Sequence, residues 1–100
     1  MDRDDVIDIL SALAQETRFE IAALLARAGE DGLPAGAIAD ALGVPQNTLS
    51  FHLSHLERAD IIRRRRAGRF IIYSAAPKII DLLILHMAEN LRPHTLKKTG

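Results

Sequence analysis

The sequence predicts a single, mainly α-helical domain that carries one β-hairpin. Two features of the composition indicate helices: 48% of the 100 residues are apolar, and only 4% are aromatic. A core of Leu, Ile and Ala in so short a chain favours packed helices. One segment departs from the helical apolar spacing and is rich in β-branched and aromatic residues. We therefore expect about five helices and two strands.

Apolar residues recur at helical spacing in two segments of the N-terminal third. The first segment covers about residues 4–14. The second is "ETRFEIAALLARAG", in which Ile21, Leu24, Leu25 and Ala28 recur in phase. Each segment is therefore predicted to be an amphipathic helix with one face available for a core.

Two further helices are joined by a very short connection. Pro34 suits the first turn of a third helix, and Gly43 suits its end. Pro45 then opens a fourth helix, which continues to about residue 59. The tight connection between them predicts a helix-turn-helix over about residues 34–59.

The fourth helix holds a phenyl ring on its polar side. At about 100° per residue, one side gathers the apolar residues Leu49, Leu53, Leu56 and Ala59. The opposite side gathers Asn47, Ser50, Ser54 and Arg58, and Phe51 lies among them. Such a ring either contacts a binding partner or packs under the hairpin or against another subunit. His52 lies near the core edge and is expected to pack, whereas His55 is placed to reach a phosphate.

The segment "DIIRRRRAGRFIIYSA" predicts the β-hairpin, over about residues 61–75, with a turn at Ala67-Gly68. Its first strand and tip carry five arginines: Arg63, Arg64, Arg65, Arg66 and Arg69. One alternative is a solvated edge strand that uses charge to prevent aggregation. Five arginines directly after a helix-turn-helix favour contact with phosphates instead.

The last predicted helix, about residues 77–91, is apolar on nearly two sides. Its inward arc is expected to contain Ile79, Ile80, Leu83, Ile84, Met87 and Leu91. Leu82 and Leu85 lie outside that arc, so the helix needs a second partner. A second copy of the chain is the simplest source. We therefore expect a homodimer through the first and last helices, with Leu10, Leu82 and Leu85 in the interface.

The net charge of zero conceals two oppositely charged halves. Residues 1–57 contain ten acidic and three basic side chains, and residues 58–100 contain the reverse. This asymmetry predicts a surface for an anionic partner. The chain has no cysteine, which excludes disulfides and thiolate metal sites. Neither a signal peptide nor an apolar membrane span is recognisable, so a cytoplasmic protein is expected.

Three linked motifs resemble the ArsR/SmtB family of bacterial and archaeal winged-helix repressors. "LAQETRFEIAALLA" resembles the family's second-helix signature, "LGVPQNTLSFHLSHLERADII" its recognition segment and "RRRRAGRFIIYS" its wing. The resemblance covers roughly residues 5–91. It implies one winged helix-turn-helix domain over residues 1–100, with the hairpin as its wing and residues 77–91 as its dimerisation helix.

The resemblance also implies which residues contact DNA. The recognition positions fall on Gln46, Asn47, Ser50 and Phe51, and the helical wheel adds Ser54 to the same outward side. The wing positions fall on Arg64, Arg65, Arg66 and Arg69. Phe51 is then an apolar contact for a thymine methyl group or a sugar edge.

The sequence departs from the family at its metal-sensing positions. Pro34 and Gly36 stand where many relatives have a cysteine pair, and Leu91 and Arg92 stand where an arsenic-sensing subgroup has vicinal cysteines. We therefore expect no metal cofactor and no thiolate-bound metal effector. A zinc or nickel site between subunits, built from His86 and His94 with Asp81 or Glu89, is the alternative left open.

Together these features predict a homodimeric, sequence-specific repressor that binds double-stranded DNA at an inverted repeat. Its effector is a small apolar ligand between the first and last helices, a protein antagonist, or none. The alternatives are a winged-helix module for protein contacts and a repressor that responds to zinc or nickel through His and carboxylate ligands. An enzyme is not expected, because the sequence contains no activated nucleophile, no paired carboxylate motif and no phosphate-binding glycine loop.

Overall fold

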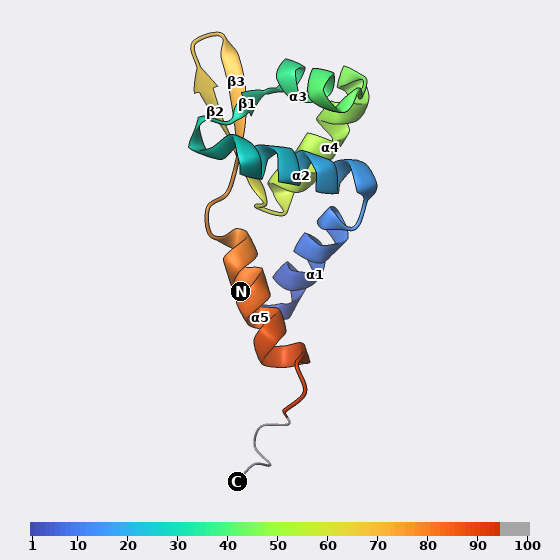
Figure 1. Cartoon of the computed structure of the whole chain (residues 1–100), viewed down its shortest axis with the longest axis vertical. Coiled ribbons are helices and arrows are strands. Elements are labelled where there is room, and N and C mark those ends of the chain that lie inside the picture. Colours follow the sequence, from blue (N-terminus) through green and yellow to red (C-terminus); the bar gives the residue numbers. More distant parts are fainter. Residues whose placement is uncertain (95–100) are drawn as a thin grey trace.

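The computed structural model describes residues 1–94, which form five α-helices and one antiparallel sheet (Figure 1). The helices are α1 (Arg3–Leu13), α2 (Glu16–Ala28), α3 (Ala35–Leu42), α4 (Gln46–Arg58) and α5 (Ile79–Leu91), and a 3-10 turn, η1 (Gly29–Asp31), follows α2. The strands are β1 (Leu33–Pro34), β2 (Ile62–Ala67) and β3 (Phe70–Ala75). The fold class predicted from the sequence is confirmed. None of the helices among these residues combines the length and hydropathy that a bilayer crossing requires.

The core lies where α1, α2, α3 and α4 meet the base of the wing. The largest fully buried side chains are Ile9, Ile21, Leu25, Ile38, Leu49, Leu56 and Ile62. They come from five different elements, because each amphipathic segment contributes only one apolar stripe. Asp2 and Asp5 form a capping box that fixes the start of α1 by pairing with each other's backbone N–H groups.

The connection between α3 and α4 is as tight as the sequence suggests. Gly43 ends α3 with φ 67° and ψ 35°, a left-handed conformation that glycine adopts at little cost. The N–H of Val44 donates to the carbonyl of Ala39, which closes the turn. Pro45 then precedes the first residue of α4, which therefore begins at a fixed angle to α3.

A left-handed residue also links α4 to the wing. Asp60 has φ 60°, and the N–H of Ile61 donates to the carbonyl of Leu56. This turn leads the chain directly into β2, which pairs with β3 from Ile62 opposite Ala75 to Ala67 opposite Phe70. The predicted hairpin is therefore present, with its turn at residues 68–69.

The prediction of two strands is wrong by one, because β1 adds to the free edge of β3. Leu33 pairs with Tyr73 and Pro34 with Ile72, giving the order β1-β3-β2. Gly32 makes this approach possible: a Cβ there would lie 2.9 Å from the Cγ2 of Ile72 and would also collide with the Tyr73 carbonyl. A strand of two residues is too short to give an alternation pattern in the sequence.

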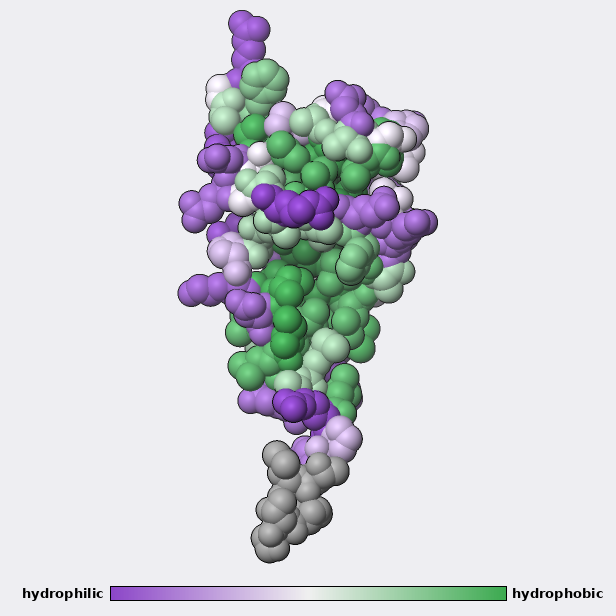
Figure 2. Space-filling model, viewed as in Figure 1, coloured by the Kyte–Doolittle hydropathy of each residue, from purple (hydrophilic) through white to green (hydrophobic). Residues whose placement is uncertain are grey.

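The sequence analysis assigned too many residues of α5 to the side that faces the core. Leu83 is buried and Ile79 and Met87 pack partly against the core, but Ile80 and Ile84 are 40% and 59% exposed, and Leu91 is also exposed. The reason is visible in Figure 1, where most of α5 projects away from the wing and the helix-turn-helix and lies beside α1. Figure 2 shows the resulting apolar surface over the part of the molecule formed by α5 and α1.

Candidate DNA interface

Helix α4 separates its apolar and polar side chains as the helical wheel predicts. Its buried side consists of Leu49, His52, Leu53 and Leu56. All five residues predicted to contact DNA from this helix are exposed: Gln46, Asn47, Ser50, Phe51 and Ser54. The core contacts of the buried side hold the helix in place while the opposite side stays open to a partner.

Phe51 stands on the open side with 63% of its surface exposed. Its ring meets the ring of His52 edge-on at 5.5 Å between centroids, and that of His55 at 6.4 Å. Both neighbours belong to the same helix, so neither the wing nor the core covers Phe51 within the protomer. The alternative that Phe51 packs under the hairpin is therefore wrong; packing against another subunit is untested.

The wing carries its arginines on both faces of the hairpin. Arg64 and Arg66 pair with Tyr73 and Ile71, whereas Arg65 pairs with Ile72, so alternate arginines point to opposite sides. All of the predicted wing contacts, including Arg69 in the turn, are exposed.

Local contacts orient three of these arginines. The Nε of Arg64 lies 3.1 Å from the Oε2 of Glu57 on α4, an ion pair that ties the wing to the helix. Arg65 donates to the Asp31 carbonyl at 3.2 Å, and Arg66 donates to the Gly68 carbonyl at 3.4 Å. Because Glu57 already balances part of its charge, Arg64 offers less to a phosphate than the other arginines do. The sequence analysis did not predict this ion pair.

The two groups of residues lie at one end of the molecule. The tip of the hairpin and the start of α4 point the same way in Figure 1, and α5 occupies the opposite end. An outward row of polar groups and one aromatic ring thus stands beside an arginine-rich hairpin, with the apolar surface of α5 and α1 well away from both.

His52 and His55 lie beneath this surface. His52 is buried, in agreement with the packing role expected for it, and its Nδ1 lies 3.3 Å from the Nη1 of Arg18. Burial lowers the pKa of His52, and the positive charge of Arg18 and the neighbouring His55 lower it further. The pKa of His55 is also lowered, by burial and then by Arg18 and Arg58.

Arg18 is a residue that the sequence analysis did not single out. It is 9% exposed and shares the buried side of α2 with Ile21 and Leu25. The signal was present in the spacing, since positions 18, 21 and 25 are in helical phase. An arginine at such a position is usually exposed to water at the border of the buried face, but Arg18 is buried.

The residues predicted for the dimer interface are distributed over both helices of the apolar surface. Leu82 and Leu85 on α5 are 45% and 54% exposed. Leu10 on α1 is only half-buried and packs partly against the protomer's own core. Ile7 and Ile80, which the sequence analysis did not assign to the interface, are exposed on the same two helices.

The residues of the alternative metal site are not brought together within one protomer. Among residues 1–94, no three His, Asp or Glu side chains lie close enough to hold a metal ion. His86 is half-buried on α5, and His94 is exposed beyond the end of that helix. The side-chain amide of Asn90 donates to the His86 carbonyl at 2.8 Å, one turn earlier on the same helix.

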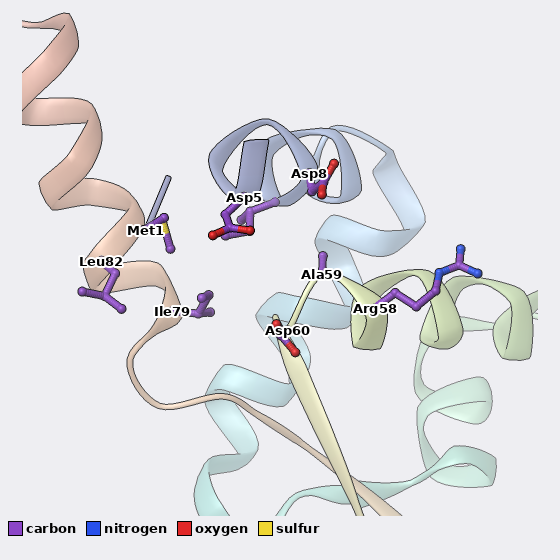
Figure 3. Close-up of a pocket in the computed structure, with 9 residues that line it drawn as sticks. Met1, Asp5, Asp8, Arg58, Ala59, Asp60, Ile79 and Leu82 are labelled. Atoms are coloured by element: carbon purple, nitrogen blue, oxygen red, sulfur yellow. The ribbon is translucent and has the colours of Figure 1, made fainter. Parts of the chain in front are cut away.

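A cleft separates α1 from the end of α4 and the start of α5 (Figure 3). Its volume is about 230 Å³, and its wall includes the carboxylates of Asp5, Asp8 and Asp60. Arg58 also borders the cleft, but its guanidinium extends away from Asp5 and Asp60. Small-molecule sites usually exceed about 300 Å³, so the cleft is small for a ligand pocket.

Comparison with known proteins agrees with this geometry. A family model described as a helix-turn-helix domain matches residues 13–65, more than half of the chain. The chain is 35% identical over 78 residues to the putative arsenical resistance operon repressor ArsR of Halobacterium salinarum. That alignment covers 78% of this chain and 60% of the repressor, so the chain spans less than two thirds of its length.

Solved structures share the fold, among them the following two. An ArsR-like transcriptional regulator from Rhodococcus sp. RHA1 superposes with a TM-score of 0.79 at 26% identity, over 86% of this chain and 78% of that chain. A homodimeric winged helix-turn-helix DNA-binding domain from Mycobacterium bovis, a possible ArsR-family regulator, superposes with a TM-score of 0.71 at 29% identity. This match covers 91% of this chain and 89% of that chain. The chain described here belongs to the ArsR/SmtB family of winged helix-turn-helix transcriptional regulators.

Proposed function

We propose that this chain is a sequence-specific transcriptional repressor that binds double-stranded DNA as a homodimer. One observation carries the proposal: all nine residues predicted to contact DNA are exposed on α4 and the wing. The start of α4 and the tip of the wing lie at the same end of the molecule (Figure 1). In this arrangement α4 enters the major groove, and Gln46, Asn47, Ser50, Phe51 and Ser54 face the base edges.

The wing supplies the electrostatic part of the binding. Arg65, Arg66 and Arg69 lie along the neighbouring phosphates, and Arg64 stays close to α4 through its ion pair with Glu57. Phosphate contacts position the protein without reading the sequence, so the specificity comes from α4.

The apolar surface of α5 and α1 supports the dimer. Large apolar side chains are exposed on both of these neighbouring helices, among them Ile7 on α1 and Ile80, Leu82 and Leu85 on α5. Exposed apolar patches are typical of protein contacts. The related Mycobacterium domain is homodimeric. A two-fold axis through this surface presents two copies of α4 to two half-sites, which requires an inverted-repeat operator. The proposal places the protein in the cytoplasm, together with its DNA.

The effector of this repressor is not a metal bound through thiolates. Thiophilic ions such as arsenite, cadmium and lead bind best through thiolates, and the chain has no cysteine. The second candidate, a zinc or nickel sensor, requires His86 and His94 to meet across the dimer, since one protomer does not bring them together.

Selection of bound duplexes from a random library tests the proposal. We expect an enriched inverted repeat, bound at least about 1,000-fold more tightly than random duplex at physiological salt. Binding that lacks any sequence preference and persists only at very low salt would favour the protein-contact module instead. Analytical ultracentrifugation of the free protein and of the complex gives the stoichiometry, which should be two chains per operator.

A further inference from the structure

Arg18 joins three helices beneath the proposed DNA-reading surface. From its place on α2, its Nε donates to the Ala12 carbonyl at 2.7 Å, and its Nη2 lies 3.5 Å from the Ser11 carbonyl. Its Nη1 lies 3.3 Å from the Nδ1 of His52 on α4. One buried guanidinium therefore contacts the last turn of α1 and the middle of α4 at the same time.

The contact with α1 satisfies a group that the helix leaves unpaired. Because α1 ends at Leu13, the Ala12 carbonyl has no N–H donor one turn further along the helix. A positive charge at a helix C-terminus is also favoured by the helix dipole. Arg18 is thus held to α1 by interactions that do not depend on the ionisation of any side chain other than its own.

The contact with α4, in contrast, requires a neutral imidazole. A guanidinium has only donors, so His52 accepts with an unprotonated Nδ1. Protonation would set an N–H and a positive charge against Arg18. The other titratable group that acts on His52 is His55 on α4. His55 in turn faces Arg58 on α4, and it borders a cleft with Asp8 of α1. Its lowered pKa keeps His52 neutral near pH 7.

The Arg18–His52 contact lies next to Phe51, the aromatic residue that faces DNA in the proposed function. Phe51 precedes His52 in the chain, and their rings touch edge-on. A change in the Arg18–His52 contact therefore reaches the outward side of α4 without passing through the wing.

We propose that Arg18 is a positioning residue, which fixes the orientation of α4 relative to α1 through neutral His52. This inference rests on the proposed function, because the orientation of α4 matters only if the helix enters a groove. Since α1 is part of the proposed dimer surface, the same contact ties each recognition helix to the two-fold axis. Operator affinity should then depend on the link, while affinity for random DNA, which depends on phosphate contacts, should not.

Two substitutions of His52 separate positioning from folding. His52→Leu removes the acceptor, whereas in His52→Asn the amide oxygen replaces Nδ1 as an acceptor that does not titrate. Both leave Arg18 on α1. Arg18→Met removes all three contacts, and Arg27→Met, which replaces an exposed arginine on the same helix, is the control. Fluorescence anisotropy measures binding to the selected operator and to a random duplex, from about pH 8 to about pH 5, across the ordinary histidine range.

We expect His52→Leu to lose about tenfold in operator affinity, the effect of one charge-assisted hydrogen bond, with random-duplex affinity and salt dependence unchanged. Wild-type operator affinity should decline once the pH falls through the lowered pKa of His52, which lies below the ordinary histidine value of about 6.5. His52→Asn should keep the neutral-pH affinity and lack this decline, and Arg27→Met should behave as the wild type.

Equal weakening on both duplexes, or an acid decline in His52→Asn as steep as in the wild type, would contradict the inference. If circular dichroism shows that Arg18→Met is unfolded, the two His52 variants decide the question. A wild-type protein that prefers no sequence would refute the proposed function itself. A selective wild type with unaffected variants would refute only the positioning role.

Discussion

Replacement of Phe51 by alanine tests the proposed interface at its most unusual residue. With 63% of its surface exposed, the ring presents about 120 Å² outward, taking about 200 Å² for an aromatic residue. A groove contact that covers about half of this area, at about 25 cal/mol per Å², stabilises the complex by about 1.5 kcal/mol. A dimer carries two rings, so Phe51→Ala should weaken operator binding by about 3 kcal/mol, or more than about 100-fold.

The same substitution should hardly affect folding. Within the protomer the ring has edge contacts with His52 and His55 of its own helix, and neither contact involves the core. We expect the free energy of unfolding to fall by less than about 1 kcal/mol. Phe19→Ala is a matched control, since Phe19 is 60% exposed but lies on α2. It should change neither operator affinity nor random-duplex affinity.

The assay combines anisotropy on operator and random duplexes with thermal melting of each variant. Replacing the contacted thymine by uracil removes only the methyl group and should weaken the wild type but not Phe51→Ala. A large fall in melting temperature together with equal weakening on every duplex would place the ring in a structural role. A uracil effect that persists in Phe51→Ala would show that another group reads the methyl.

The other predictions concern the wing, the dimer, the effector and acid stability. Arg69→Ala should flatten the log–log salt dependence of binding by about two units per dimer, on operator and random DNA alike; relaxed specificity at one base pair would instead show that the wing reads sequence. Leu82→Glu and Leu85→Glu should each give monomers or unfolded chains in light scattering, because a buried, unpaired charge costs several kcal/mol; stable dimers of both would place the interface elsewhere. Titration of arsenite, antimonite, cadmium or lead into a preformed complex should release no DNA, and stoichiometric release by arsenite would overturn the assignment. The pKa values of His52 and His55 are lowered in the folded chain, so below about pH 6.5 the unfolded chain binds more protons than the folded chain does. The free energy of unfolding should therefore fall as the pH falls through that range, and an unfolding free energy that does not change with pH there would contradict this prediction.

Much of this protein was predictable because its local patterns depend only on neighbouring residues. Apolar spacing near 3.6 residues distinguishes the helices from the hairpin, which is rich in β-branched and aromatic residues, and the same spacing places Phe51 opposite Leu49 and Leu53. Gly43 and Pro45 fix the tight turn through their own backbone preferences. These features determine the order of the elements along the chain. In the proposed function, α4 and the wing then contact DNA, and α1 and α5 contact a second copy of the chain.

The tertiary structure alone decided which of several possible contacts each element makes. The spacing in α5 shows that the helix is apolar on two sides, but only packing shows that Leu83 faces the protomer while Ile84 does not. Strand β1 exists because Gly32 lets the chain approach the free edge of β3. Neither fact is a property of the segment itself, since each depends on where another element lies.

The buried arginine is the clearest case. In sequence, Arg18 is one charged residue in phase with Ile21 and Leu25, and the usual outcome is a side chain that reaches water. Burial becomes favourable only when donors find acceptors, and here those acceptors are the carbonyls of Ser11 and Ala12 and the ring of His52. They come from α1 and α4, up to 34 residues away along the chain. The sequence determined the helices that carry these groups, and only the packing of three helices decided that the groups meet.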